Sequence, residues 1–170
     1  MLNKKILGYR TSSILKNNKA KRLSTNYKDA GSIGIIYTSE DWGKHHIVKE
    51  FKKSLEDDGK EVKVLTLLPK GLENFEFLFD FFTTKDISFW GNFTAEQVHK
   101  FVNATFDYLF YLDTKSNLLI KNILALSKAR CRVGKYEETD SQFFELMINT
   151  RSDSTSELVN EMYKYTKILN

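Results

Sequence analysis

Beyond residue 31, the hydrophobic positions follow two alternating patterns: short apolar runs, and longer stretches with one apolar face. The run SIGIIYTS at residues 32–39 is apolar and flanked by glycine, which predicts a buried strand. The next stretch predicts a helix that ends at Gly59 and turns one apolar face inward. That face consists of Ile47, Val48, Phe51 and Leu55. A second strand at residues 61–69 completes a parallel pair with a right-handed crossover.

The middle of the chain is less regular. Residues 71–86 are rich in phenylalanine and fit neither the helical nor the strand period, so we expect a short helix or turn that covers the sheet. A short third strand is expected at residues 87–90. The following helix begins with a capping box, in which Thr94 caps and Gln97 reaches back. Its buried stripe is formed by Val98, Phe101 and Val102.

The second half of the chain continues the alternation. Residues 106–113 and 130–136 predict a fourth and a fifth strand, separated by an apolar helix at residues 115–129. Two further helices are expected at residues 141–149 and 155–169. This order predicts an α/β fold. We expect a single Rossmann-like three-layer domain with about five mostly parallel strands, preceded by a basic N-terminal helical arm.

Charge divides the chain into two parts. The arm, residues 1–30, holds eight basic side chains and Asp29 as its acid, a net charge of about +7. Because the whole chain is +4, the domain at residues 31–170 carries about −3. Net charge governs association rather than fold. The distribution therefore indicates a polyanionic partner bound by the arm.

The arm predicts a helix with apolar residues roughly on one side and cations around the rest. Lysine, arginine and asparagine are mixed in KNNKAKRL and suit contacts with phosphates and base edges. The candidate nucleic-acid-binding residues are Lys4, Lys5, Arg10, Lys16, Lys19, Lys21 and Arg22. The arm also fits a solvated tail, a helix packed on the acidic domain, a membrane-surface helix or an organelle transit segment.

Polar residues follow several of the expected strands, and ligands of open α/β sheets bind at the carboxyl ends of the strands. The candidate ligand pocket consists of Asp41, Trp90, Asp113 and Lys115. Other roles are open for the acids in this set. Asp113 also fits a cap for the following helix or turn. Glu40 and Asp41 also fit partners of a helix dipole.

The histidines and glycines carry no recognisable motif. His45 and His46 are adjacent on a helix and point about 100° apart, so we expect a solvated pair rather than a metal site. Gly31 and Gly34 lie before and inside the first strand, where they cannot form a phosphate-binding turn. No GxSxG motif occurs. We therefore expect no catalytic residue, no metal and no cofactor.

Cys131 is the single cysteine, and its place in the expected fifth strand predicts a small buried hydrophobic residue. A chain without disulfides fits a reducing compartment. The apolar runs are too short to span a bilayer, and the N-terminus lacks the apolar core of a secretory signal. We expect a cytoplasmic protein with no integral membrane insertion.

Residues 106–136, FDYLFYLDTKSNLLIKNILALSKARCRVGKY, resemble the acceptor-side domain of heptosyltransferase-type glycosyltransferases. The resemblance implies a Rossmann-like fold. In those enzymes a second domain of this kind holds the nucleotide-sugar donor, for which this chain has no room. Asp41 lies roughly where that family has a catalytic acid, but the surrounding glycine pattern is missing, so no catalytic role is carried over.

A broader resemblance rests on the stretches KDISFWGNFTAEQV, SKARCRVGKY, FELMINT and YKYTKILN. They are similar to a family of small uncharacterised proteins from flavobacteria and related Bacteroidetes. The resemblance implies a free-standing cytoplasmic bacterial protein and assigns no activity.

Three functions remain for this sequence. The first is a non-enzymatic protein that binds RNA, in particular ribosomal RNA, with phosphate contacts from Lys16, Lys19, Lys21 and Arg22. The second is an enzyme or sensor that binds a small polar ligand at the carboxyl ends of the strands. The third is a protein–protein adaptor that uses an exposed patch at residues 75–82.

Overall fold

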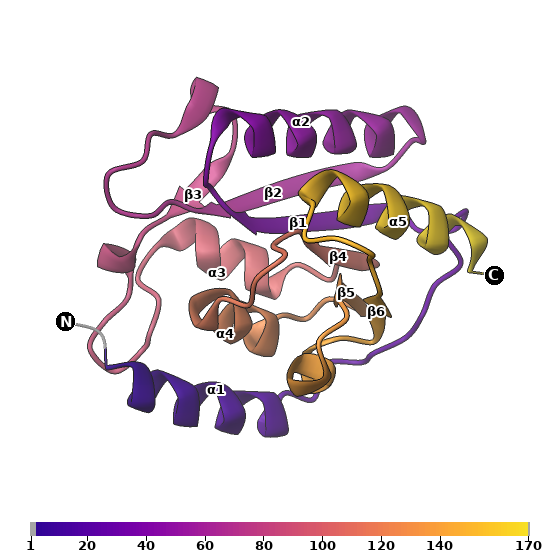
Figure 1. The fold of residues 1–170 in the computed structure, drawn as a ribbon. Helices are drawn as coiled ribbons and strands as arrows, with labels where there is room; N and C mark the ends of the chain where they lie inside the picture. Colours follow the sequence, from indigo (N-terminus) through magenta and orange to yellow (C-terminus); the bar gives the residue numbers. More distant parts are fainter. Residues whose placement is uncertain (1–2, 170) are drawn as a thin grey trace.

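The computed structural model describes residues 3–169, which fold around a six-stranded, all-parallel sheet (Figure 1). The strand order is β3-β2-β1-β4-β5-β6. The strands are β1 (Ser32–Thr38), β2 (Glu61–Leu67), β3 (Asp80–Phe82), β4 (Tyr108–Tyr111), β5 (Cys131–Lys135) and β6 (Leu146–Ile148). Because β1 pairs with both β2 and β4, the order of the strands reverses beside β1. This is the point where open α/β sheets bind ligands.

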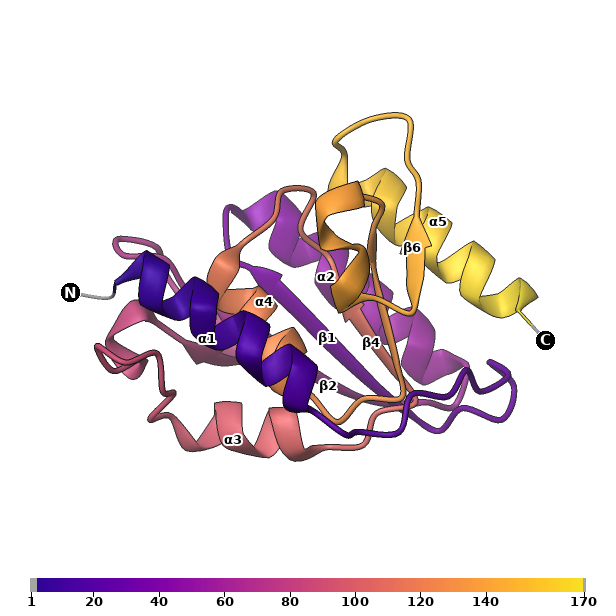
Figure 2. The same ribbon diagram turned by 90° about the horizontal axis from the view of Figure 1, so that it is seen from below.

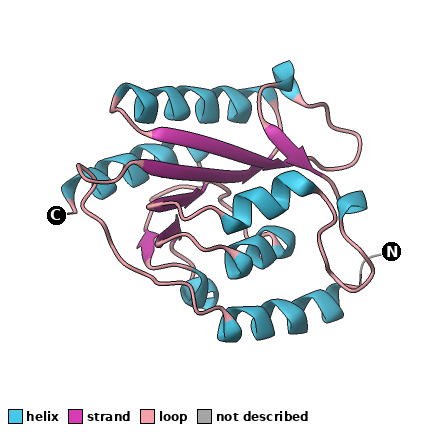
Figure 3. Cartoon of the chain, turned by 180° about the vertical axis from the view of Figure 1, so that it is seen from behind, coloured by secondary structure: helices cyan, strands magenta, loops and turns pink. Residues whose placement is uncertain are grey.

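Helices cover both faces of the sheet (Figure 3). One face is covered by α2 (Trp42–Asp57) and α5 (Thr155–Ile168), and the other by α3 (Glu96–Asn103) and α4 (Leu118–Leu126). Each face has its own apolar core. The core beneath α2 includes Val48, Phe51 and Leu55, as the helical pattern predicts. No helix within residues 3–169 has the length and apolar character needed to cross a membrane.

The arm begins with α1 (Lys4–Asn17), which lies outside α4 as an additional layer (Figures 1 and 2). The expected helix in the arm is therefore present. Leu7 faces the domain and is buried, and Ile14 and Leu15 pack partly against the core. After α1 the chain runs in an extended path past the amino ends of the strands before it enters β1 (Figure 2).

Three of the predictions of secondary structure are wrong. The third strand lies at Asp80–Phe82, inside the phenylalanine-rich segment. Residues 87–90 contain an isolated antiparallel bridge from Ile87 to Phe93 and a turn at residues 89–90, but no strand of the sheet. Thr94 does not cap α3, whose N-cap is Ala95 without a side-chain hydrogen bond. The expected helix at residues 141–149 is replaced by a 3₁₀ segment, η3 (Glu138–Phe143), and by the sixth strand β6. Phe144 and Ile148 pack on opposite faces of the sheet, so their helix-like spacing does not mark one helical face.

Gly34 lies in the middle of β1, where a side chain would not fit. A Cβ at this position would lie 2.7 Å from the ring of Phe106. The glycine therefore serves close packing between the strand and the chain before β4. This agrees with the expectation that Gly31 and Gly34 do not form a phosphate-binding turn.

Candidate functional site

The arm is held against the domain by polar as well as apolar contacts. Thr11 of α1 is buried, and its hydroxyl donates to the carbonyl of Leu7 at 2.7 Å and accepts from the side-chain amide of Asn122 at 2.8 Å. Asn122 lies on α4 and is fully buried. A hydrogen bond between buried side chains fixes the position of one helix on the other. The arm therefore does not form a free tail in this structure.

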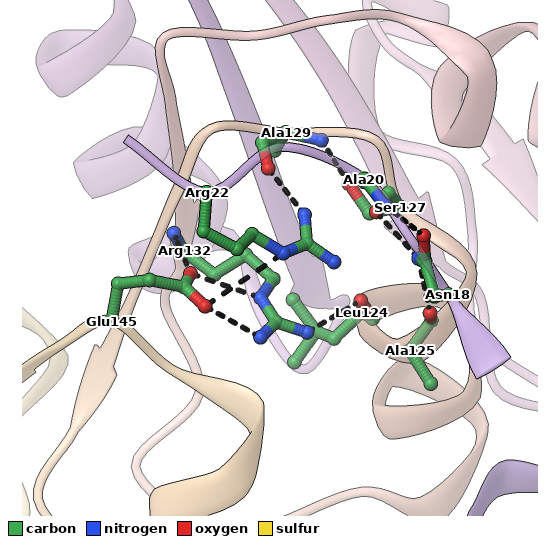
Figure 4. A network of polar contacts seen from close by, with 9 residues as sticks. All are labelled: Asn18, Ala20, Arg22, Leu124, Ala125, Ser127, Ala129, Arg132 and Glu145. Atoms are coloured by element: carbon green, nitrogen blue, oxygen red, sulfur yellow. Dashed lines mark hydrogen bonds and ion pairs between the residues drawn. The ribbon is translucent and has the colours of Figure 1, made fainter. Parts of the chain in front are cut away.

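The segment after α1 bonds to the backbone of the last turn of α4 and of the loop before β5 (Figure 4). The Asn18 amide donates to the carbonyls of Ala125 and Ser127, at 2.7 and 3.0 Å. The guanidinium of Arg22 donates to the carbonyl of Ala129 and lies 3.8 Å from the carboxylate of Glu145. Partial burial lowers the pKa of Arg22, and repulsion from the nearby Arg132 adds to the effect.

Two of the seven candidate nucleic-acid-binding residues thus have internal partners. Arg22 is bound to the domain, and Arg10 donates to the side chain of Asn92. The remaining five, Lys4, Lys5, Lys16, Lys19 and Lys21, are exposed. None of the five forms an ion pair with any residue in the described range 3–169.

Lysines of the domain behave differently. Most of them lie within ion-pair distance of a carboxylate, namely Lys44, Lys49, Lys52, Lys53, Lys63, Lys100, Lys121, Lys135, Lys164 and Lys167. The arm therefore presents its lysine charges outward, even though its backbone is docked.

A stripe on the outer face of α1 continues into a groove. Lys5, Tyr9 and Lys16 fall on one side of the helix by its 3.6-residue period, opposite the buried Leu7 and Thr11. Tyr9 is 81% exposed. The groove has a volume of about 510 Å³ and is lined by Asn18, Lys19, Ala20, Lys21, Thr105, Lys128 and Arg130. We call the stripe and the groove together the cationic surface.

Opposite this groove, at the carboxyl ends of the strands, Asp113 forms a buried ion pair. Its Oδ1 atom lies 2.8 Å from the ammonium of Lys44, and both side chains are 4% exposed. Asp113 also accepts hydrogen bonds from the backbone amide of Thr38 at 2.8 Å and from the Thr38 hydroxyl at 2.6 Å. The pair joins the ends of β1 and β4 to α2, at the point where the strand order reverses. Asp113 does not cap α4, because Asn117 does.

Asp113 also lines a cavity of about 310 Å³ at the ends of β4 and β5. Its lining residues are Tyr111, Asp113, Thr114, Lys115, Ser116, Lys135, Glu137, Asp140, Phe144 and Asp153. We call this the carboxyl-edge cavity. The structure therefore brings together Asp113 and Lys115 from the candidate pocket.

The other two candidate pocket residues lie elsewhere. Asp41 is the N-cap of α2, where its carboxylate accepts from the backbone amide of Lys44 at 2.8 Å. This is the helix-terminus role that the sequence left open. Trp90 is 64% exposed and packs edge-on against Phe89. Neither residue lines the carboxyl-edge cavity.

The expectation of a solvated histidine pair is right for His46 and wrong for His45. His45 is buried, and its Nε2 atom lies 2.9 Å from a carboxylate oxygen of Glu76. Hydrogen bonds from His45 and Lys49 lower the pKa of Glu76. No group of three or more potential ligands within residues 3–169 could hold a metal ion.

The phenylalanine-rich segment is divided between core and surface. Phe79 and Phe82 are buried, whereas Phe77 is 87% exposed. Glu76 and Phe77 both have positive φ angles, of 56° and 47°. Such angles are uncommon outside glycine. The contacts of Glu76 with His45 and Lys49 hold this turn in place.

Sequence reasoning missed several residues that shape these sites. For Lys44, the sequence offers one signal of an ion pair, because this lysine lies four residues after Glu40. The two side chains do pair, at 2.7 Å. Asp140 and Lys121 form an ion pair across 19 positions of the chain, which no local pattern indicates. Cys131 is buried as expected, and burial raises the pKa of its thiol to about 11.

Comparison with known proteins gives a family but no activity. No curated protein matches the chain, and no solved structure matches it. The resemblance to the heptosyltransferase acceptor-side domain therefore gains no support from these comparisons. Residues 3–169 match the model of a family of unknown function, DUF6913, which spans the arm and the domain together. The chain belongs to this family.

Proposed function

We propose that this protein binds RNA through the cationic surface. The observation that carries the proposal is the state of the arm's lysines, which are exposed and form no ion pair with the residues that the structure describes. Lysines without a carboxylate partner are free to replace the counterions of a phosphate backbone. The docked arm holds them on a fixed support, which lowers the entropy lost on binding.

The arrangement of the surface favours a nucleic acid over a compact anion. Lys5 and Lys16 are separated by three turns of α1, and Lys19 and Lys21 extend the row into the groove. A row of this kind follows a backbone of successive phosphates. Tyr9 lies within the row, and an exposed aromatic ring stacks on unpaired bases at about 1–3 kcal/mol per base. We therefore expect single-stranded RNA to bind more tightly than a duplex.

The experiment reverses four charges of the cationic surface, Lys5, Lys16, Lys19 and Lys21, to glutamate. Arg22 is left intact because its guanidinium holds the arm. The matched control reverses four exposed lysines of the domain, Lys53, Lys63, Lys100 and Lys164, and changes the net charge by the same amount. Binding of a labelled single-stranded RNA is measured over a range of salt concentrations.

Reversal at the cationic surface should abolish RNA binding, and the control should retain most of it. For the unchanged protein, the slope of log K against log salt should be about −0.7 for each phosphate contact. Substitution of the same four lysines by glutamine should reduce that slope by roughly 3. Co-sedimentation with ribosomes tests whether ribosomal RNA is the target. Equal loss of binding in the surface and control variants would refute a specific surface.

A further inference from the structure

The carboxyl-edge cavity lies at the opposite edge of the sheet from the groove of the cationic surface. It is formed after β4, β5 and β6, whereas the groove is lined by residues that precede β4 and β5. Its volume of about 310 Å³ is at the lower end of the range for ligand pockets, which suits a small molecule. The RNA proposal uses none of its residues.

Six charged side chains line the cavity, and four of them have internal partners. Asp113 pairs with Lys44, and Asp140 pairs with Lys121. Lys135 and Asp153, which both line the cavity, pair with each other. Each of these four side chains therefore has a counter-charge within ion-pair distance, and Lys44 is shared with Glu40, which does not line the cavity. The electrostatic preference of the cavity therefore depends on the two charges that remain.

The remaining charges are of opposite sign. Lys115 and Glu137 are both exposed lining residues, and neither forms an ion pair within the described part of the chain. A simple anion would leave Glu137 uncompensated beside it, and a simple cation would do the same to Lys115. A ligand with one group of each sign satisfies both.

The inner wall offers further acceptors for a cationic group. Asp140 is buried, and its Oδ1 atom accepts from Lys121 and Thr139. Its Oδ2 atom receives no hydrogen bond from the described residues and keeps some contact with solvent. Beside these polar groups, the rings of Tyr111 and Phe144 stack with their centroids 6.2 Å apart and supply an apolar surface.

We propose that the carboxyl-edge cavity binds a small zwitterion of the amino-acid class. Lys115 pairs with the carboxylate of the ligand, while Glu137 and Oδ2 of Asp140 accept hydrogen bonds from its ammonium group. The ligand's side chain packs against Phe144. Hydrogen bonds between charged partners are the stronger class, and two such ends select for both charges at once.

The test is calorimetric titration of the full chain with each standard amino acid in turn. For any that binds, the N-acetyl derivative and the carboxamide are titrated as probes that lack one charge. We expect binding by one or a few amino acids, and a loss of about tenfold or more in affinity for each derivative. A rise in melting temperature with ligand concentration provides an independent readout.

Two variants localise the site. Glu137→Gln and Lys115→Met change exposed side chains, so the fold should persist, and each should weaken binding by about tenfold or more. The controls are Glu138→Gln and Lys63→Met, which alter exposed charges outside the cavity and should bind as the unchanged protein does.

Three results would overturn the proposal. They are the absence of binding by every amino acid, equal binding of the derivatives, and normal affinity in both cavity variants. The RNA-binding variant with four reversed lysines should keep its amino-acid binding, so failure of one proposal is distinguishable from failure of the other.

Discussion

Replacing Lys44 by methionine tests the buried ion pair at the reversal point of the sheet. Methionine keeps much of the apolar stem and removes the ammonium that lies 2.8 Å from Asp113. Asp113 would then retain its two hydrogen bonds from Thr38 but lose its counter-charge, at a position where its side chain is 4% exposed. Loss of one partner of a buried pair costs about 3–5 kcal/mol. Because the bonds from Thr38 remain, we expect a loss of about 3 kcal/mol.

The matched control is Lys53→Met. Lys53 pairs with Asp57 at 2.7 Å, but these side chains are 66% and 64% exposed. An exposed pair of this kind is screened by solvent and contributes little to stability, so Lys53→Met should leave the free energy of unfolding almost unchanged. The free energy of unfolding is measured by urea denaturation, and the two variants are compared at a common m-value.

A double-mutant cycle completes this test. Asp113→Asn alone and combined with Lys44→Met should show a coupling free energy of about 2 kcal/mol. Lys44→Met leaves Asp113 without its counter-charge, whereas Asp113→Asn leaves Lys44 with the more exposed Glu40 as its remaining partner. If Lys44→Met destabilises the protein no more than Lys53→Met does, the ion pair does not hold β1, β4 and α2 together, and the reasoning is wrong.

Two further predictions concern the arm and the C-terminal helix. Leu7→Ala should cost about 2–4 kcal/mol or release α1, because this side chain is 1% exposed; hydrogen exchange of the α1 amides measures the release, and unchanged protection would contradict the packing described. Burial alone would raise the pKa of Asp58, but hydrogen bonds from Tyr163, Tyr27 and Lys167 outweigh it and lower the pKa to about 2. A lowered pKa stabilises the fold above the unfolded value near 4, and this stability is lost as pH falls through 2. Asp58→Asn should therefore cost about 1 kcal/mol at pH 7, and urea titrations from neutral to acidic pH should show the difference shrinking.

The regular part of the fold could be predicted from the sequence because its signals are local. The apolar run of β1 and the helical face of α2 each depend on residues close together in the chain. The secondary-structure predictions were wrong at the short edge strands, where the pattern of apolar and polar residues is interrupted. In β3, Phe81 is exposed and Phe82 is buried, but neighbouring phenylalanines conceal this alternation.

The site residues show the same limit. Asp113 and Lys115 could be predicted to lie at the carboxyl ends of the strands because this requires only the position where β4 ends. Both residues line the carboxyl-edge cavity. The partner of Asp113 could not be found in this way, because Lys44 lies 69 positions away and is brought close by the sheet. Likewise, composition revealed the cations of the arm, but its docking depends on the buried pair of Thr11 and Asn122.

The way the arm is attached has a consequence for any attempt to isolate the domain. A truncated protein that starts at Gly31 would lack Asn18 and Arg22, and the carbonyls of Ala125, Ser127 and Ala129 would lose these donors. The ammonium of Lys60, which donates to the carbonyls of residues 27 and 30 at 2.7 Å, would lose both of them. The outer side of α4 would also be uncovered. Such a fragment should aggregate when expressed. Point substitutions are therefore the sounder way to separate the function of the arm from that of the domain.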